Sequence, residues 1–417
     1  MAGCGPLFQT KWKAKMEVFA IDWLNLLFRW AHLIVGVGWI GTSFYFIALD
    51  LSLRRRQGQA DGILGSAWLV HGGGFYNVEK FTVAPDHLPD DLVWYKWEAY
   101  LTWVTGFALI ILQYYLKAES YLIDPSVMAL TNLQAIGISL VSLTIGWLAY
   151  NGMCRLFLGK STIGLGITLT AFIILAAYGY SQVFSGRGAL IHVGALIGTM
   201  MAFNVFRIII PNQKKIVASL LAGEKPDPTL GQIGKQRSVH NNYLTLPVLL
   251  MMVSNHYPFI TNHPQNWLVV ALIMVVGASF RHFLNSHEAA HGKPKEEVKS
   301  YGWALGVTAI GIIVAFFFTA PTVRDTSGTD LVTDAQILAL SQKHCVSCHA
   351  AEPTHEFFEE APNGAMFETL ADLKRYRSII KTQVVDTDIM PLGNETGMTD
   401  EERNQLAVWI ASLEDSE

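Results

Sequence analysis

Residues 344–349 read His-Cys-Val-Ser-Cys-His, and this stretch decides how the C-terminal part of the chain folds. Two cysteines separated by two residues and followed directly by histidine form the attachment pattern of a c-type haem. The thiols of Cys345 and Cys348 can form thioethers with the haem vinyl groups, and the His349 imidazole then lies under the iron as a ligand. A zinc site or a redox dithiol is the alternative for a CxxC pair, but no other cysteine follows Cys154. The stretch therefore predicts a covalent haem.

A second axial ligand is expected on the far side of such a haem, commonly a methionine sulfur. Met390 lies in the Pro- and Gly-containing stretch 388–394, which cannot be helical. Met366 and Met398 are the competing candidates, and Met398 stands at the start of the next helix. We expect His349 and Met390 to hold the iron.

The segment after this loop predicts a closing helix. Thr399–Glu402 has the pattern of a capping box and opens an amphipathic helix over Glu401–Leu413. A CxxCH helix, a methionine loop and a closing helix with Trp409 resemble a small class I cytochrome c. The resemblance covers residues 330–417 and implies Met390 as the second ligand.

The composition of the rest indicates an integral membrane protein. The 417 residues are 51% hydrophobic and 15% charged, with a mean hydropathy of +0.31, whereas an average soluble domain is about 25% charged. The shortage of charge is concentrated before residue 320. No P-loop, dinucleotide-binding fingerprint or basic patch is visible, so no nucleic acid partner is expected.

The apolar stretches predict an all-α fold, in which a polytopic bundle of about eight membrane spans precedes the cytochrome domain. Each stretch is long enough to cross a hydrocarbon core of about 30 Å. The expected division is an N-terminal extension (1–22), a membrane domain (23–320), a linker (321–329) and a cytochrome c domain (330–417). The predicted spans are Trp23–Leu53, Glu98–Tyr115, Val127–Tyr150, Ile163–Val183, Ala189–Ile210, Tyr243–Ile260, Trp267–Phe283 and Gly302–Ala320.

The distribution of lysine and arginine predicts the orientation of these spans. The segments after the first, third, fifth and seventh spans are rich in Lys and Arg, as in Arg54–Arg56, and the intervening loops are short and poor in them. Both termini are therefore expected outside the cytoplasm. Haem is attached to CxxCH outside the bacterial cytoplasmic membrane, so the motif leads to the same side. We expect a multi-pass protein of the bacterial inner membrane with a periplasmic cytochrome domain.

Two connecting segments are unusually long. Residues 57–97 contain the Gly-rich run His71–Tyr76, and we expect this segment to pack back onto the bundle. Residues 212–242 form the second long connection.

Three histidines of the predicted spans fall at a similar depth on the outer side. They are His32, His192 and His256, each on a different span, with Arg29 nearby. An ionisable residue inside a span is costly and is a functional candidate. We expect this outer layer to form the redox site, although histidines near helix ends can also be merely hydrogen-bonded.

A second set of polar residues is expected near the cytoplasmic side. His240 and His282 lie there, joined by Arg281. Two histidine layers on facing helices could hold b-type haems through neutral imidazoles. The alternative is again hydrogen-bonded structural histidines, and Arg207 could simply extend to the membrane surface.

Several membrane-domain stretches carry a resemblance to a known family. They are Trp30–His32, Gly36–Gly41, His71–Tyr76 and Lys96–Tyr100. Fused to a cytochrome c, these stretches resemble the membrane-bound urate oxidase (urate hydroxylase) family. The resemblance implies oxidation of urate to 5-hydroxyisourate, with electrons passed to the haem c and on to a respiratory acceptor such as a cytochrome oxidase. His32, His192, His256 and Arg29 would then be either haem b ligands or the donors and base for the purine.

Two functions of other classes remain compatible with the same residues. One is a quinol:cytochrome c electron-transfer module, in which the membrane histidines hold b-type haems. The other is a non-enzymatic cytochrome subunit of a respiratory oxidase. Reduction of the protein's own haem by urate, and not by quinol, would indicate urate oxidation and exclude the quinol:cytochrome c module. Absence of any substrate-driven haem reduction would favour the oxidase subunit.

Overall fold

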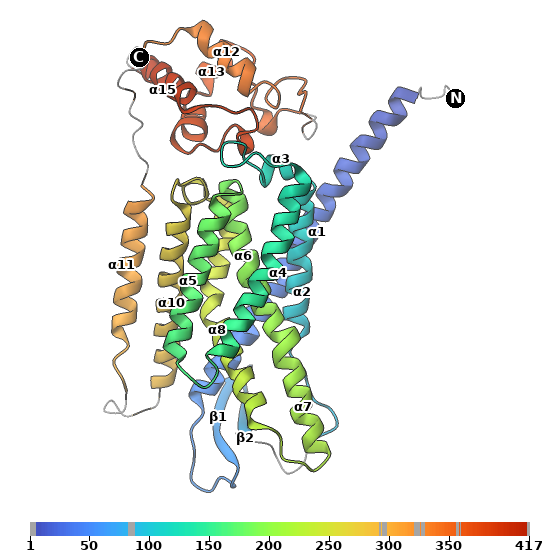
Figure 1. Cartoon of the computed structure of the whole chain (residues 1–417), viewed down its shortest axis with the longest axis vertical. Coiled ribbons are helices and arrows are strands. Elements are labelled where there is room, and N and C mark those ends of the chain that lie inside the picture. The colour runs from blue at the N-terminus through green and yellow to red at the C-terminus, as the bar shows by residue number, and fades with distance from the viewer. Residues whose placement is uncertain are drawn as a thin grey trace.

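The chain folds into a tall helical bundle with a smaller helical segment at one end (Figure 1). The computed structural model describes residues 6–81, 88–291, 293, 298–320, 326, 330–355, 358 and 360–414, the side chains of 6–15, 17, 18 and 414 excepted. The predicted linker 321–329 lies outside these residues except for Thr326. The expectation of a mainly helical protein is confirmed.

Each of the eight predicted stretches contains a helix of the bundle. The bundle helices are α1 (Pro6–Ser52), α2 (Trp97–Ile110), α3 (Ala118–Tyr121), α4 (Asn132–Leu156), α5 (Thr162–Ser181), α6 (Gly186–Phe203), α7 (Ile210–Leu221), α8 (Pro228–Val253), α9 (Pro258–Thr261), α10 (Asn266–Ala290) and α11 (Gly302–Phe318). Among the described residues, five helical segments are long and apolar enough to cross a membrane: Phe19–Ser52, Asn132–Leu156, Thr162–Ser181, Gly186–Leu221 and Asn266–Ala290. The apolar helix α11 is shorter.

Side-chain caps explain where several of these helices begin. The Thr131 hydroxyl accepts from the Gln134 N–H while Gln134 accepts from the Thr131 N–H, and this capping box opens α4. The N-termini of α5, α6 and α8 are capped by the side chains of Ser161, Ser185 and Asp227, each of which accepts from a backbone N–H of the first turn. Each cap satisfies backbone N–H groups that the first helical turn leaves without a partner.

In the described part of the bundle, two π-helical turns interrupt the regular helices. Ile111–Tyr115 continues α2, and Asn204–Ile209 joins α6 to α7. Such turns often occur at functional sites because they change the direction in which side chains project. The first of them lies at the cavity described below.

The prediction of a second long connection at residues 212–242 is wrong. Helix α7 extends to Leu221, and α8 begins at Pro228 rather than near Tyr243. The first half of α8 is rich in polar residues that are buried and hydrogen-bonded, among them Arg237, His240 and Asn241. Hydropathy alone therefore places the start of this helix too late.

The first long connection contains a β-hairpin. Strands β1 (Ile63–His71) and β2 (Gly74–Phe81) pair antiparallel, with His71 opposite Gly74. Gly72 and Gly73 have φ of 58° and 80°, as a two-residue type I′ turn requires. The expectation that this segment packs back onto the bundle is wrong for its tip, because Val70 and Phe75 are 69% and 76% exposed. The hairpin projects from the end of the bundle opposite the C-terminal segment (Figure 1).

The C-terminal segment has an apolar core of its own. Its helices are α12 (Asp334–His344), α13 (Leu370–Arg375), α14 (Arg377–Ile380) and α15 (Asp400–Glu414), with a π-helical turn at Lys381–Asp386. Trp409 is 2% exposed at the centre of this core, and its indole N–H donates to Asp334 Oδ1 at 2.7 Å. The predicted capping box is present, because Glu402 accepts from the Thr399 N–H and Thr399 accepts from the Glu402 N–H.

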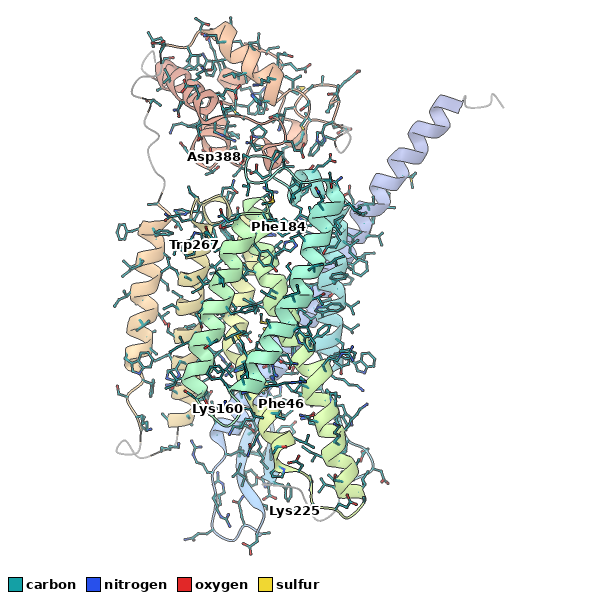
Figure 2. All side chains as sticks on the ribbon, viewed as in Figure 1. Phe46, Lys160, Phe184, Lys225, Trp267 and Asp388 are labelled. Atoms are coloured by element: carbon teal, nitrogen blue, oxygen red, sulfur yellow. The ribbon has the colours of Figure 1, made fainter. Side chains whose placement is uncertain are left out.

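The C-terminal segment rests on one end of the bundle. Figure 2 shows Asp388 facing that end, where Phe184 and Trp267 lie, whereas Lys160 and Lys225 lie at the opposite end. Asn262 Nδ2 donates a hydrogen bond across this contact to the Thr387 carbonyl at 3.0 Å.

Candidate functional site

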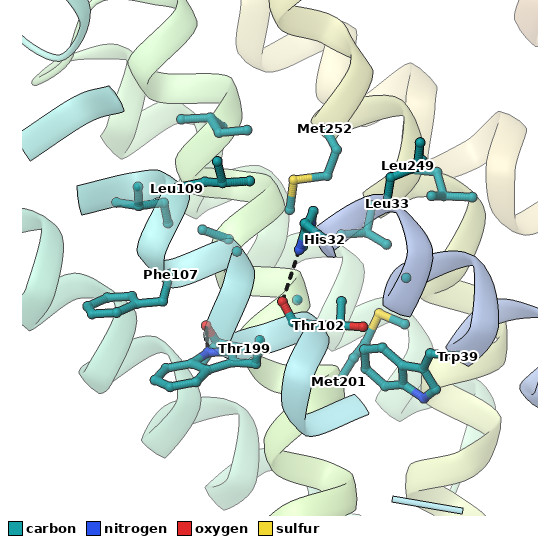
Figure 3. A pocket seen from close by; sticks show the side chains of 18 of the residues that line it. His32, Leu33, Trp39, Thr102, Phe107, Leu109, Thr199, Met201, Leu249 and Met252 are labelled. Atoms are coloured by element: carbon teal, nitrogen blue, oxygen red, sulfur yellow. Dashed lines mark hydrogen bonds between the residues drawn. The ribbon is translucent and has the colours of Figure 1, made fainter. Parts of the chain in front are cut away.

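A cavity of about 490 Å³ lies inside the bundle, between α1, α2, α6 and α8. This size falls within the range of about 300–1,000 Å³ that is typical of small-molecule sites. Much of its wall is apolar, and Figure 3 shows Leu33, Trp39 and Met252 among the side chains around it. The polar residues of the lining are Arg29, His32, Ser43, Thr102, Gln113, Tyr114, Arg187, Thr199, Asn241, Thr245, Asn255 and His256.

The charged residues that line the cavity are positive. Arg29 and Arg187 contribute guanidinium groups, and among the described residues that line the cavity there is no aspartate or glutamate. Positive groups between apolar walls raise the local concentration of anions. A guanidinium also presents several donors in one plane, which suits a flat anion with several acceptors. The chemistry of this lining therefore suits a planar, negatively charged small molecule.

His32 is held with one ring nitrogen occupied and the other unused. Its Nδ1 lies 3.0 Å from the Thr102 carbonyl and 3.0 Å from Thr105 Oγ1, and Figure 3 shows the first of these bonds. A carbonyl can only accept, so Nδ1 carries the hydrogen and Nε2 keeps a lone pair. A neutral imidazole oriented in this way can act as a general base or as a metal ligand.

The absence of a side chain at Gly106 makes this arrangement possible. A Cβ at residue 106 would lie 2.9 Å from Cε1 of His32, a distance that real Cβ contacts do not tolerate. The ring of His32 on α1 therefore lies directly against the backbone of α2.

Arg29 lies at the open side of the cavity and is positioned by two amides. Its Nε donates to Asn25 Oδ1 at 2.7 Å, and its Nη2 donates to Gln113 Oε1. Gln113 belongs to the π-helical turn Ile111–Tyr115, and both Gln113 and Tyr114 line the cavity. The turn thus presents two neighbouring side chains to one space.

The end of the cavity nearest α3 is formed by Tyr114, Arg187 and Asn255. Asn255 Nδ2 donates to the Tyr114 hydroxyl at 2.7 Å. The guanidinium of Arg187 lies 5.3 Å from the centre of the Tyr121 ring, at the end of α3. His256, which follows Asn255, also lines the cavity.

The three predicted outer histidines are not all brought together. His32 and His256 line the same cavity, whereas His192 is fully buried and is not part of its lining. Both ring nitrogens of His192 are already engaged, Nε2 with Ser139 Oγ at 2.7 Å and Nδ1 with the Gly188 carbonyl at 2.7 Å. The geometry gives His192 a structural role beside the site.

The histidines of the inner layer are hydrogen-bonded to tyrosines. His240 Nδ1 lies 2.9 Å from the Tyr150 hydroxyl, and His282 Nδ1 lies 2.8 Å from the Tyr243 hydroxyl. Within the described part of the chain, no three His, Cys, Asp or Glu side chains are grouped closely enough to hold a metal ion.

Three arginines of the bundle, Arg237, Arg281 and Arg207, contact other residues of the bundle. Arg237 is 2% exposed and donates to Asn151 Oδ1 at 2.7 Å. Arg281 lies over the Phe44 ring at 3.6 Å, and Arg207 lies over the Phe206 ring at 5.1 Å. None of the three lines the cavity.

Sequence reasoning missed Gln113, Tyr114, Arg187 and Asn255. An uncharged amide inside the apolar stretch 98–115 was the available signal for Gln113, because a polar group within such a stretch needs a partner. No sequence pattern indicates the π-helical turn that turns Gln113 and Tyr114 toward the same cavity.

The CxxCH residues follow α12 directly. Cys345 caps this helix, and Cys345 and Cys348 are free thiols. His349 Nδ1 donates to the Ala365 carbonyl at 2.8 Å, which leaves the lone pair of Nε2 available, as in a histidine that binds a metal. These donors fit a covalently attached haem.

The methionine loop is held by its backbone. The Met390 carbonyl accepts from Arg403 Nη1 at 2.7 Å, and the Met390 N–H donates to the Gln383 carbonyl at 2.9 Å. Met398 is 4% exposed within the apolar core, whereas Met390 lies at its margin. Met366 is 39% exposed.

The fold and the cavity define a multi-helix protein with an internal, electropositive small-molecule pocket. Residues 18–319 match the family model described as Urate oxidase N-terminal. The chain therefore belongs to this family, which indicates an oxidoreductase concerned with urate. The matched residues include the whole cavity lining and end before the C-terminal segment. Comparison with curated proteins and with solved structures finds no match.

Proposed function

We propose that this protein oxidises urate to 5-hydroxyisourate in the membrane and passes the electrons to a haem c in its C-terminal segment. The observation that carries the proposal is the cavity lining, which has two arginines and no carboxylate among its described residues. This lining lies within a chain of the urate oxidase family. Urate at neutral pH is a flat monoanion with several acceptors, which is the kind of molecule that such a lining binds.

The arginines and amides of the cavity would bind and orient the purine. Arg29 and Arg187 stand on different helices and can donate to urate oxygens from two sides. Gln113 already fixes the Arg29 guanidinium, so little side-chain entropy is lost when the anion binds. The apolar walls exclude water and strengthen these charge-assisted hydrogen bonds.

His32 would accept a proton in the reaction. Urate and water yield 5-hydroxyisourate, two protons and two electrons. The oxygen added to the purine comes from water, which must lose protons as it attacks. Nε2 of His32 has a lone pair and Nδ1–H is anchored to Thr102, so the ring is oriented to act as a general base.

Cys345, Cys348, His349 and Met390 would hold the haem. When bound, a c-type haem supplies a centre that accepts one electron at a time. The anchored Nδ1–H of His349 and the hydrogen-bonded backbone of Met390 would fix the two axial ligands. A respiratory acceptor such as a cytochrome oxidase would then remove the electrons.

The apolar helices support a place in the bacterial inner membrane. We propose the eight-span arrangement with a membrane domain at 23–320 and a periplasmic cytochrome domain at 330–417. Lys160 and Lys225 lie at the end of the bundle opposite the C-terminal segment (Figure 2), which agrees with a cytoplasmic position for that end.

The test is urate turnover by the solubilised full-length protein without oxygen. With a soluble one-electron acceptor present, we expect urate consumption to continue in the absence of oxygen, and the same reaction in air should form no hydrogen peroxide. Strict dependence on oxygen with release of peroxide would contradict the haem pathway. Reduction of the acceptor by quinol and not by urate would favour an electron-transfer module instead.

A further inference from the structure

The loop that follows Met390 is in direct contact with the bundle. Gly393 has φ of 62°, and a Cβ at this position would lie 2.8 Å from the Ser120 carbonyl oxygen and 3.3 Å from that of Glu119. Only glycine fits both the backbone conformation and the space. The loop is therefore seated on the α3 backbone and does not merely lie near it.

The surface under this loop is itself tightly packed. Asn262 donates to the Thr387 carbonyl from the turn after α9. That turn in turn lies against the start of α6, where a Cβ on Gly186 would lie 2.0 Å from the Thr261 carbonyl oxygen. The Ser185 N–H donates to the Leu122 carbonyl at 2.9 Å and ties α6 to the residues after α3. The contact surface is one connected platform made by α3, α6 and the 261–262 turn.

The same platform closes one end of the cavity. Tyr121 follows Ser120 directly, and its ring centre lies 6.3 Å from that of Tyr114 and 5.3 Å from the Arg187 guanidinium. Tyr114 and Arg187 both line the cavity. A single layer of side chains and α3 backbone therefore separates the cavity from the residues next to Met390.

We propose that this contact is where electrons leave the bundle, and that Gly393 is the positioning residue that holds the Met390 loop at the required distance. The inference rests on the proposed function: urate gives up two electrons in the cavity, and the C-terminal haem takes them one at a time. Transfer through protein slows steeply with distance, so a loosely tethered C-terminal segment would be a poor acceptor. The close contact of Gly393 with Ser120 prevents the C-terminal segment from moving away from the bundle at this point.

A matched pair of glycine variants tests the proposal in the full-length haem-loaded protein. Gly393→Ala places a methyl group against the Ser120 carbonyl. Gly397→Ala is the control, because Gly397 has nearly the same φ of 63° but a Cβ there meets nothing within 4 Å. Both variants carry the same local cost of a positive φ, and only the first is expected to lift the loop from α3.

Two measurements are made on each variant. Hydrogen exchange of the backbone amides of 118–123 reports the contact without any substrate. Stopped-flow reduction of the haem by urate, compared with reduction by dithionite, reports electron delivery. We expect Gly393→Ala to exchange faster at 118–123 and to slow urate-driven reduction several-fold relative to Gly397→Ala, since transfer through protein slows with distance. Its dithionite reduction and its methionine–iron absorption should match Gly397→Ala.

The proposal is overturned if Gly393→Ala leaves exchange unchanged, or if exchange rises while urate-driven reduction stays at the control rate. Absence of urate-driven reduction in the wild type would refute the proposed function, while the exchange comparison would still decide whether the contact exists. If Gly393→Ala binds less haem than the control, Asn262→Ala takes its place, because it removes the hydrogen bond to Thr387 from the other side of the contact.

Discussion

His32 and Gly106 meet where α1 crosses α2, so closely that a Cβ on Gly106 would lie 2.9 Å from Cε1 of His32. The contact holds the imidazole between a carbonyl anchor at Thr102 and the cavity. The position of the His32 ring, the proposed base, therefore depends on the absence of a side chain at Gly106.

Changing His32 to Gln should lower urate-driven haem reduction by about 10²- to 10⁴-fold, the usual contribution of a positioned general base. The measurement is single-turnover reduction with saturating urate. His192→Gln is the comparison, because His192 is buried outside the cavity. It should lower stability, by roughly 1–3 kcal/mol for the polar partners left unpaired, with urate-driven reduction near the wild-type rate. Equal losses of rate in both variants would contradict the assignment of His32.

Gly106→Ala should displace the His32 ring and reproduce much of the loss expected of His32→Gln, because the added methyl group would lie only 2.9 Å from Cε1. Gly137→Ala on α4 is the matched control, since a Cβ there meets nothing within 4 Å. A wild-type rate in Gly106→Ala would show that the close contact is not needed for catalysis.

Arg29→Gln should weaken urate binding by about 10- to 100-fold, in line with the roughly 1.5–3 kcal/mol of a hydrogen bond to a charged group. The dissociation constant is measured by equilibrium binding to the oxidised protein. Arg207→Gln removes a guanidinium that lies over Phe206 outside the cavity, so it should bind urate as the wild type does. Similar weakening by both changes would point to a general effect of charge and not to a contact by Arg29.

Met390→Leu should remove the weak long-wavelength absorption that methionine–iron ligation gives, and the haem should stay attached through Cys345 and Cys348. Met398→Leu should keep this absorption, because Met398 is packed inside the apolar core. The ligand assignment fails if the band is lost only in the Met398 variant.

Glu402 predicts an acid-dependent contribution to the stability of the C-terminal segment. Burial opposes its ionisation, but hydrogen bonds from Lys343, Thr399 and His344 outweigh burial and hold the pKa of Glu402 at about 2, below the ordinary 4.5. A depressed carboxylate pKa stabilises the fold above the ordinary value, and this stability is lost as the pH falls toward 2.

Glu402→Gln should therefore lower the thermal unfolding midpoint of the segment at neutral pH, with a cost of roughly 1 kcal/mol because glutamine keeps the capping box. The difference from wild type should shrink between about pH 4.5 and pH 2. Glu401→Gln, an exposed carboxylate on the same turn, is the control. A difference that does not change with pH would show that charge at Glu402 is not the cause.

The apolar runs were sufficient to predict where most helices lie. Helices α4, α5, α10 and α11 fall within the predicted stretches or a few residues from them, because their buried and exposed faces are both apolar. The early start of α8 was missed because Arg237, His240 and Asn241 face inward, where they are hydrogen-bonded to Asn151, to Tyr150 and to the Met201 carbonyl. The hairpin was missed although Gly72 and Gly73 stand between two runs of strand-forming residues, which is a recognised hairpin signal.

The candidate site shows a different limit of sequence reasoning. Depth along a helix follows from residue counting, which predicts His32, His192 and His256 in the outer half. The direction in which a side chain points depends on packing, and His192 turns away toward Phe184, with ring centres 4.6 Å apart. Gln113 and Tyr114 reach the cavity through a π-helical turn that no local pattern announces.

The most direct measurement is an anaerobic titration of the oxidised, purified protein with urate, followed by the visible spectrum of its haem. The proposed function predicts full reduction of the haem, with about two haem groups reduced for each urate consumed, because urate yields two electrons and each haem accepts one. A haem that stays oxidised with excess urate, yet is reduced at once by dithionite, would contradict it.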